Sequence, residues 1–278
     1  MNTAEPRFVP MHTDLESVET LTGRGWRGGI IPQHRAFSKL RVNPWAILTN
    51  IVLVVGLSWA WIKVLPDVGI LWQKIFLGCS NFVGLHAGIA TVHKNWGAHV
   101  QLDVPYLTIP ASSPGAATWW ITAFITSAVF LGSFYVSEEE LPLRYLARGL
   151  ALLQFTALAY FAVAAARFPH DLSGYTVGML VFGSVLIGLI PLVLGLTYFV
   201  FEFTWWQKLG LALLSMAHLT LLMPLQYFLH AYVLHNSILF MPLLYFAFGP
   251  FLDVLIFIAF YSWGMSWAGI TTPQSTRP

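Results

Sequence analysis

Cys79, His86 and His93 stand seven residues apart in one apolar stretch of the chain. Seven residues make nearly two turns of an α-helix, so in a helix all three side chains would lie along one face. Gly84 and Gly88 flank His86, and small residues let a second helix or a flat cofactor come close. The pattern predicts a ligand-binding or proton-handling face. The alternative is that these side chains only pack and hydrogen-bond against neighbouring helices.

Six of the nine histidines are predicted to lie in or near one leaflet of a membrane. They are His86, His93, His99, His170, His230 and His235. A haem b held by one histidine from each of two helices, or a non-haem metal ion, would draw its ligands from this set. We expect cofactor ligands at His86, His93 and His230, with His235 as a further metal ligand. Neither a His-x-x-His-His nor a His-Glu-x-x-His motif is present to specify the cofactor.

A second candidate pair lies deeper in the predicted membrane. His218 and Asp253 fall at depths that differ by roughly 5 Å, at about 1.5 Å per residue, on the last two predicted helices. Asp253 follows Gly249-Pro250, where a kink would free backbone groups. An Asp–His pair in a low dielectric can act as a general base with its orienting group, or can relay protons. We expect Asp253 and His218 to be catalytic; the alternative is a buried hydrogen bond without a chemical role.

The elements that must position these residues are membrane-spanning helices. The chain has 278 residues, of which 57% are hydrophobic and only 9% are charged, with a mean hydropathy of +0.68. A soluble domain carries about 25% charged residues. So few charges cannot cover a water-exposed surface, and the composition therefore predicts a polytopic integral membrane protein.

Seven apolar runs approach or exceed the ~20 residues that a ~30 Å hydrocarbon core requires. We expect an all-α, polytopic membrane helical bundle of about seven transmembrane helices. The predicted spans are 45–64, 69–92, 116–136, 145–166, 174–201, 207–234 and 238–266. Residues 1–43 form a polar N-terminal tail, 44–267 the transmembrane domain and 268–278 a C-terminal tail. The longest connection, Lys94 to Gly115, is expected to be a loop at the membrane interface.

Two pairs of small residues occur at helical spacing within the span 174–201. They are Gly174 with Gly178, and Ser184 with Gly188. Small residues four apart let neighbouring helices approach closely. Both pairs therefore predict helix–helix contacts.

The charge distribution and the cysteine content predict the orientation in the membrane and exclude a disulfide. Six of the 14 Lys and Arg residues lie in the N-terminal tail, so the positive-inside rule predicts a cytoplasmic tail, in a cell inner or plasma membrane. Cys79 is the one cysteine, which excludes an intramolecular disulfide. The sequence has no basic stripe of the kind that binds nucleic acid.

Three functions remain open from the sequence. The first is a membrane-embedded enzyme that acts on a lipid-like or apolar small-molecule substrate through intramembrane His and Asp residues. The second is a haem- or quinone-binding redox subunit of a membrane complex. The third is a non-catalytic subunit, bound to other membrane subunits, or a transporter. The low charge inside the spans disfavours an ion-coupled transporter, since ion coupling relies on buried ionisable groups.

Overall fold

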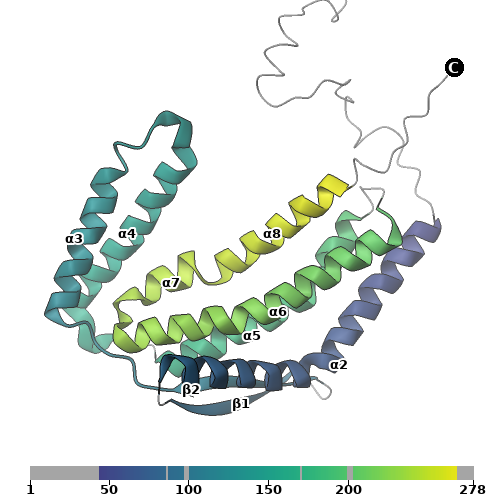
Figure 1. Cartoon of the computed structure of the whole chain (residues 1–278), viewed down its shortest axis with the longest axis horizontal. Coiled ribbons are helices and arrows are strands. Elements are labelled where there is room, and N and C mark those ends of the chain that lie inside the picture. The colour runs from purple at the N-terminus through teal and green to yellow at the C-terminus, as the bar shows by residue number, and fades with distance from the viewer. Residues whose placement is uncertain (1–43, 86, 97–99, 170, 199–202, 268–278) are drawn as a thin grey trace, which may run out of the picture. The chain divides into compact units, whose positions relative to one another are not determined.

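The fold is that of a computed structural model. It describes residues 44–85, 87–96, 100–169, 171–198 and 203–267. All of them belong to one compact unit of the chain, Asn43–Pro278. Helices dominate this unit (Figure 1). They are α2 Pro44–Val83, α3 Ala116–Gly132, α4 Leu141–Ala164, α5 Leu172–Thr197, α6 Trp205–Asn236, α7 Met241–Ala247 and α8 Pro250–Trp267, with short 3₁₀ turns η1 Glu138–Glu140, η2 Ala165–Arg167 and η3 Ile238–Phe240.

Five helical segments are long and apolar enough to cross a membrane. They are Ile47–Val83, Glu138–Ala164, Leu172–Thr197, Trp205–Asn236 and Ile238–Ser266, and α3 is a shorter apolar helix. The predicted all-α helical membrane bundle is therefore confirmed for the described part of the chain. The predicted number of seven helices is not established by these segments.

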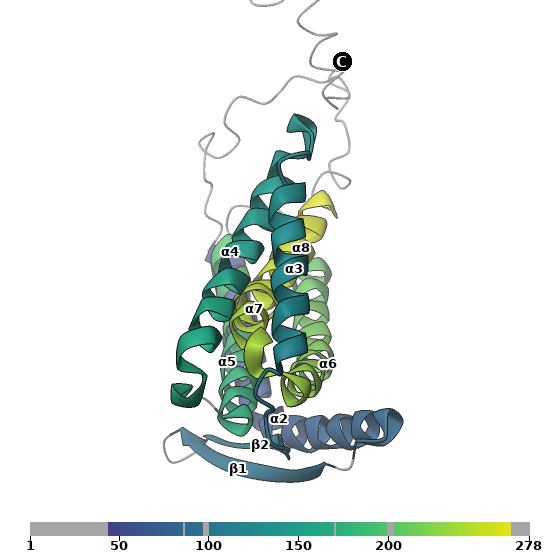
Figure 2. The same ribbon diagram turned by 90° about the vertical axis from the view of Figure 1, so that its left-hand side faces the viewer.

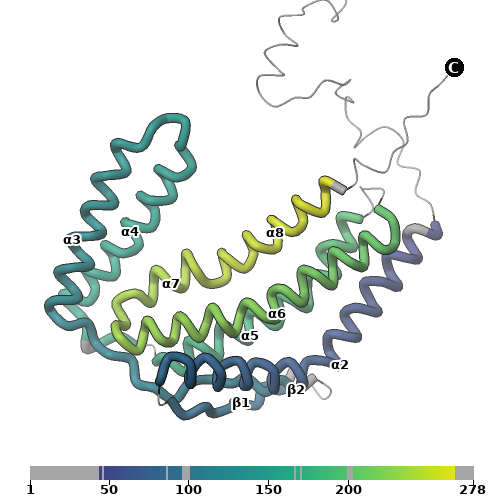
Figure 3. Tube along the Cα trace, viewed as in Figure 1, coloured from purple at the N-terminus to yellow at the C-terminus, as the bar shows by residue number. Residues whose placement is uncertain are grey.

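Two features account for the difference in number. The predicted span 116–136 is the shorter helix α3, of 17 residues, and helix α2 contains two predicted spans. It has 40 residues with Pro66 inside it, so at 1.5 Å per residue it is about 60 Å long, twice a ~30 Å core. Proline removes one backbone hydrogen bond and bends a helix, and α2 changes direction along its length (Figure 3). The spans 45–64 and 69–92 thus begin on one bent helix. We call residues 67–83 its distal limb.

A β-hairpin follows α2, where the sequence predicted the end of a helix and a loop. Strand β1 Gly88–Trp96 pairs antiparallel with β2 Val100–Thr108. The prediction that a helix continues to residue 92 was wrong, and so was that of an irregular connection from Lys94 to Gly115. As a consequence, Cys79 lies on a helix and His93 on a strand, so the predicted one-face stripe does not form.

The local sequence explains why the helix stops and a hairpin begins. Gly84 has φ of +69°, a left-handed conformation that ends a helix and that glycine adopts without strain. Along β2 the side chains then alternate: Leu102 and Val104 are buried, whereas Gln101 and Asp103 are more exposed. A period of two is the pattern of a strand with one covered face.

The distal limb of α2 is fastened to α6 by two aromatic residues. Pro224 has no N–H to donate to the carbonyl of Thr220, four residues earlier in α6. The buried indole Nε1 of Trp72 donates to that carbonyl instead, at 2.8 Å. Phe76 packs against Phe228 with ring centroids 6.1 Å apart. The distal limb and the hairpin consequently lie together beneath α5 and α6 in Figures 1 and 2.

The first limb of α2 packs against α5, and α5 against α6. The indole of Trp61 donates to the carbonyl of Ser184 at 3.1 Å and lies against Gly188. A Cβ at Gly183 would collide with the side chain of Met223. The prediction that Ser184 and Gly188 mark a close helix approach is therefore confirmed.

Helices α3 and α4 form a pair that is joined to the rest through η3 and α7. The indole of Trp119 donates to the carbonyl of Leu158 at 3.0 Å, which ties α3 to α4. The amide of Gln154 donates to the carbonyl of Leu239 at 3.4 Å, which ties α4 to η3. This second contact fixes the start of α7, which forms one wall of the cavity described below.

Candidate functional site

Asp253 is fully buried in the first turn of α8 and is paired with a tyrosine of α6. The hydroxyl of Tyr227 donates to Oδ2 of Asp253 at 2.8 Å. Both residues have an exposed fraction of 0%. Oδ1 of Asp253 has no hydrogen-bond partner among the described residues. Burying a carboxyl group with a single donor costs free energy, and a group retained at such a cost is a candidate for a functional role.

His218, the partner predicted for Asp253, lies elsewhere. Its ring packs against Phe260, with centroids 4.9 Å apart. His218 precedes Tyr227 by nine residues, about 13 Å along α6. The prediction assumed one helix over 238–266, but the chain breaks between α7 and α8 at Phe248-Gly249. This break changes the depth of Asp253 relative to α6.

A second buried pair joins α5 to α6. The hydroxyl of Tyr175 and Nδ1 of His230 are 2.9 Å apart. The phenol donates to Nδ1 when the neutral imidazole carries its hydrogen on Nε2. This bond holds the imidazole of α6 against the phenol of α5.

The two pairs touch one another. The rings of Tyr227 and His230 meet edge-on with centroids 5.3 Å apart. Gln226 donates to the carbonyl of Phe248 at 2.6 Å and lies beside Asp253. The result is a row across α5, α6 and α8, made of two hydrogen-bonded pairs that meet at the rings of Tyr227 and His230. We call Tyr175, His230, Tyr227 and Asp253 the Tyr–His–Tyr–Asp row.

Tyr175, the first member of this row, also lines a cavity of about 670 Å³ between α5 and α7. Its wall includes Gly178 and Met179 of α5 and Met241, Tyr245 and Phe246 of α7. A Cβ placed on Gly178 would meet open space. Gly174 and Gly178 therefore border a cavity, and do not make the helix contact that their spacing predicted. Ligand pockets in proteins have volumes of about 300–1,000 Å³.

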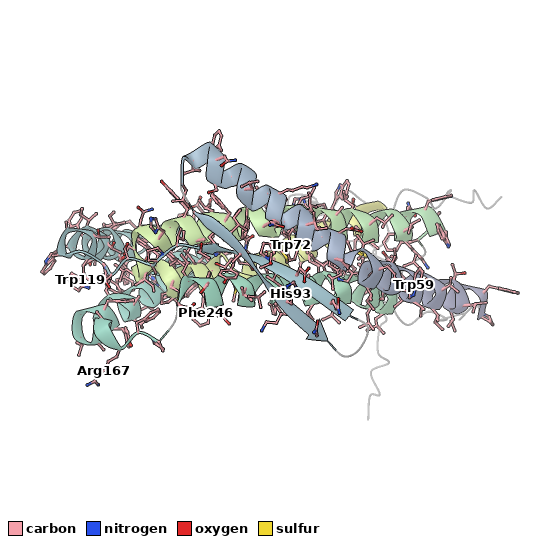
Figure 4. All side chains as sticks on the ribbon, turned by 90° about the horizontal axis from the view of Figure 1, so that it is seen from below. Trp59, Trp72, His93, Trp119, Arg167 and Phe246 are labelled. Carbon is pink, nitrogen blue, oxygen red and sulfur yellow. The ribbon has the colours of Figure 1, made fainter. Side chains whose placement is uncertain are left out.

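The predicted haem or metal ligands do not lie close together in the described structure. His93 lies on the hairpin (Figure 4) and pairs with Asp103 at 2.5 Å, and His235 donates to the carbonyl of Pro110 at 2.8 Å. His86 lies outside the described residues, as do His99 and His170. No group of three His, Cys, Asp or Glu side chains that could hold a metal ion is present within the described ranges.

A separate polar cluster connects α2, α5 and α6 through Lys208. Its ammonium donates to Oδ1 of Asn50 at 2.8 Å, and the hydroxyl of Tyr198 donates to the backbone carbonyl of Lys208 at 2.7 Å. Burial raises the pKa of the Tyr198 hydroxyl, which therefore stays a neutral donor. These contacts join three helix ends, and we regard the cluster as structural.

Comparison with known proteins does not assign this site. No protein-family model, no curated protein and no solved structure matches the chain. The row and its cavity are therefore the features of the described structure that indicate a function.

Sequence reasoning found two of the four members of the row and missed both tyrosines. Tyr227 carries a weak signal, because it stands three residues before His230 and so shares its helix face. Tyr175 carries none, since its position beside His230 depends on how α5 packs against α6. Buried histidine and aspartate are conspicuous in an apolar span, whereas tyrosine is common there.

Proposed function

We propose that this integral membrane protein is an enzyme that acts on a lipid-like or apolar substrate bound between α5 and α7. The observation that carries the proposal is the position of Tyr175, whose side chain lines the cavity and hydrogen-bonds the buried His230. A largely apolar cavity whose wall carries a phenol bonded to a buried imidazole suits a substrate that is apolar apart from one reactive polar group.

The hydrogen bonds suit a general-base step. A substrate hydroxyl would give its proton to the oxygen of Tyr175 while Tyr175 passes its own proton to Nδ1 of His230. The substrate oxygen keeps the electron pair of its O–H bond and becomes the nucleophile. His230 becomes an imidazolium whose Nδ1–H faces the oxygen of Tyr175.

Asp253 would stabilise the positive charge that this step creates. Its carboxyl group is bound to Tyr227, whose ring contacts His230. A carboxylate near a buried imidazolium favours the charged form, whereas burial alone would disfavour it. In this proposal Asp253 is a positioning and electrostatic residue, Tyr175 is the catalytic residue, and His218 has no part.

The test compares lipid turnover by wild type with that of two variants. The purified full chain is incubated with a lipid extract of its expression host, and mass spectrometry follows which lipid species are consumed. Tyr175→Phe and His230→Gln should each lower the rate by about 100-fold or more, the typical size of an acid–base contribution. Tyr232→Phe, a partly exposed phenol on the same helix as His230, should keep the wild-type rate.

Two results would overturn the proposal. One is an extract that wild-type protein leaves unchanged relative to a heat-denatured sample. The other is a conversion that Tyr175→Phe catalyses at the wild-type rate.

A further inference from the structure

A second pocket, of about 300 Å³, adjoins the cavity at the start of α5. Ser113 and Ser173 contribute hydroxyl groups to its lining, and Ile238 of η3 closes one side. Phe168 and Asp171 line both this pocket and the larger cavity. The two spaces are therefore neighbours that share a wall, one rich in polar groups and the other apolar.

The walls of the polar pocket are held by specific contacts. The backbone N–H of Ile238 donates to the carbonyl of Ser112 at 3.0 Å, and Nδ1 of His235 donates to the carbonyl of Pro110 at 2.8 Å. These two bonds fix the segment that follows β2 against the end of α6. The sequence predicted His235 as a metal ligand; in the structure its imidazole supports this wall.

Asp171 gives the pocket its charge and links it to Tyr175. It caps α5, accepting from the backbone N–H of Gly174 at 3.1 Å and from the hydroxyl of Ser173. It is the one charged side chain among the described residues that line the pocket. Tyr175 follows four residues later, which is about one helical turn, or 5–6 Å.

We infer that the ligand of this site is an amphiphile with an uncharged, hydroxyl-bearing head and one apolar chain. The head lies in the polar pocket, where serine hydroxyls and the Asp171 carboxylate suit hydroxyl groups and disfavour a phosphate or carboxylate head. The chain occupies the apolar cavity between α5 and α7. The role given to the ligand as substrate rests on the proposed function, because one of its hydroxyls would then reach Tyr175.

Binding is measured by native mass spectrometry of the purified full chain with three probes that share one oleoyl chain. The probes are monooleoylglycerol, oleate and oleoyl-lysophosphatidylglycerol. We expect one molecule of monooleoylglycerol to be retained, with an affinity at least about tenfold higher than for either anionic probe, equivalent to about 1.4 kcal/mol. Equal retention of the three probes would overturn the inference about the head.

Two pairs of variants locate the ligand. Gly178→Leu fills the cavity and should abolish retention, whereas Gly210→Leu, also facing open space but on α6, should not. Ser113→Leu fills the polar pocket, and Ser137→Leu, an exposed serine outside the lining, is the control. Retention that survives both Gly178→Leu and Ser113→Leu would place the ligand elsewhere and overturn the inference.

Tyr175→Phe separates this inference from the proposed function. It should still retain monooleoylglycerol while losing lipid turnover. Retention in wild type together with unimpaired turnover in Tyr175→Phe overturns only the enzymatic proposal. Turnover without retention of any probe overturns only the inference about the ligand.

Discussion

The hydroxyl of Tyr227 donates to Oδ2 of Asp253 at 2.8 Å, and this bond joins α6 to α8 between two fully buried side chains. Bonds of this kind to a carboxylate are stronger than neutral hydrogen bonds. Tyr227→Phe should lower the free energy of unfolding by about 1.5–3 kcal/mol, because a buried carboxyl group loses its donor. Denaturant titration in detergent micelles measures the change.

A double variant tests whether the cost comes from the stranded carboxyl group. Adding Asp253→Leu to Tyr227→Phe should recover part of the lost stability, since both polar partners are then gone. Tyr232→Phe is the control and should stay within about 0.5 kcal/mol of wild type. A loss in Tyr227→Phe no larger than in this control would contradict the importance of the bond.

The bond from Trp72 to Thr220 predicts a second pair of variants. Trp72→Phe keeps an aromatic ring but leaves the Thr220 carbonyl unpaired, because Pro224 has no N–H to offer. We expect a loss of about 1–3 kcal/mol and faster proteolysis of the hairpin that packs on the distal limb of α2. Limited proteolysis followed by mass spectrometry of the 88–108 region measures the second effect.

Pro224→Ala supplies the matched test of that explanation. Alanine at this position restores the backbone N–H, so the combined variant with Trp72→Phe should be less destabilised than Trp72→Phe alone. Trp59→Phe, on the exposed first limb of α2, should leave proteolysis of the hairpin unchanged. If Pro224→Ala brings no recovery, the carbonyl of Thr220 is not the reason for the loss.

The buried contact between Lys208 and Asn50 predicts a strong energetic coupling. Asn50→Leu removes the acceptor that Lys208 contacts at 2.8 Å and should cost about 1.5–3 kcal/mol, as for other hydrogen bonds to charged groups. Combining it with Lys208→Met should cost much less than the sum of the single variants. Additive losses in a double-mutant cycle would argue that the two side chains act independently.

In contrast to the Lys208–Asn50 contact, the pair formed by His93 and Asp103 should contribute little to the free energy of unfolding. Their side chains are 74% and 49% exposed, and exposed ion pairs contribute little because water and salt screen them. Asp103→Asn should therefore change the unfolding free energy by no more than about 0.5 kcal/mol, and lipid turnover should be unaffected. A large loss of turnover would mean that the hairpin takes part in the reaction.

The sequence alone was enough to predict the class of this protein and two of its buried polar residues. With 9% charged residues, the chain can satisfy its backbone and cover its surface only as apolar helices in a bilayer. His230 and Asp253 stood out because polar groups inside such helices are costly. These conclusions depend on composition and on the types of single residues, and both can be known without knowledge of the fold.

Only the tertiary structure decided which polar groups meet. Asp253 contacts Tyr227 instead of His218 because the chain breaks between α7 and α8, and His230 meets Tyr175 because α5 packs beside α6. The hairpin likewise occupies a stretch whose apolar content predicted a helix. Gly84 ends α2, and the side chains that follow alternate with a period of two, as in a strand. Helical periodicity places residues along one helix, whereas the contacts that make a site depend on breaks, bends and packing between helices.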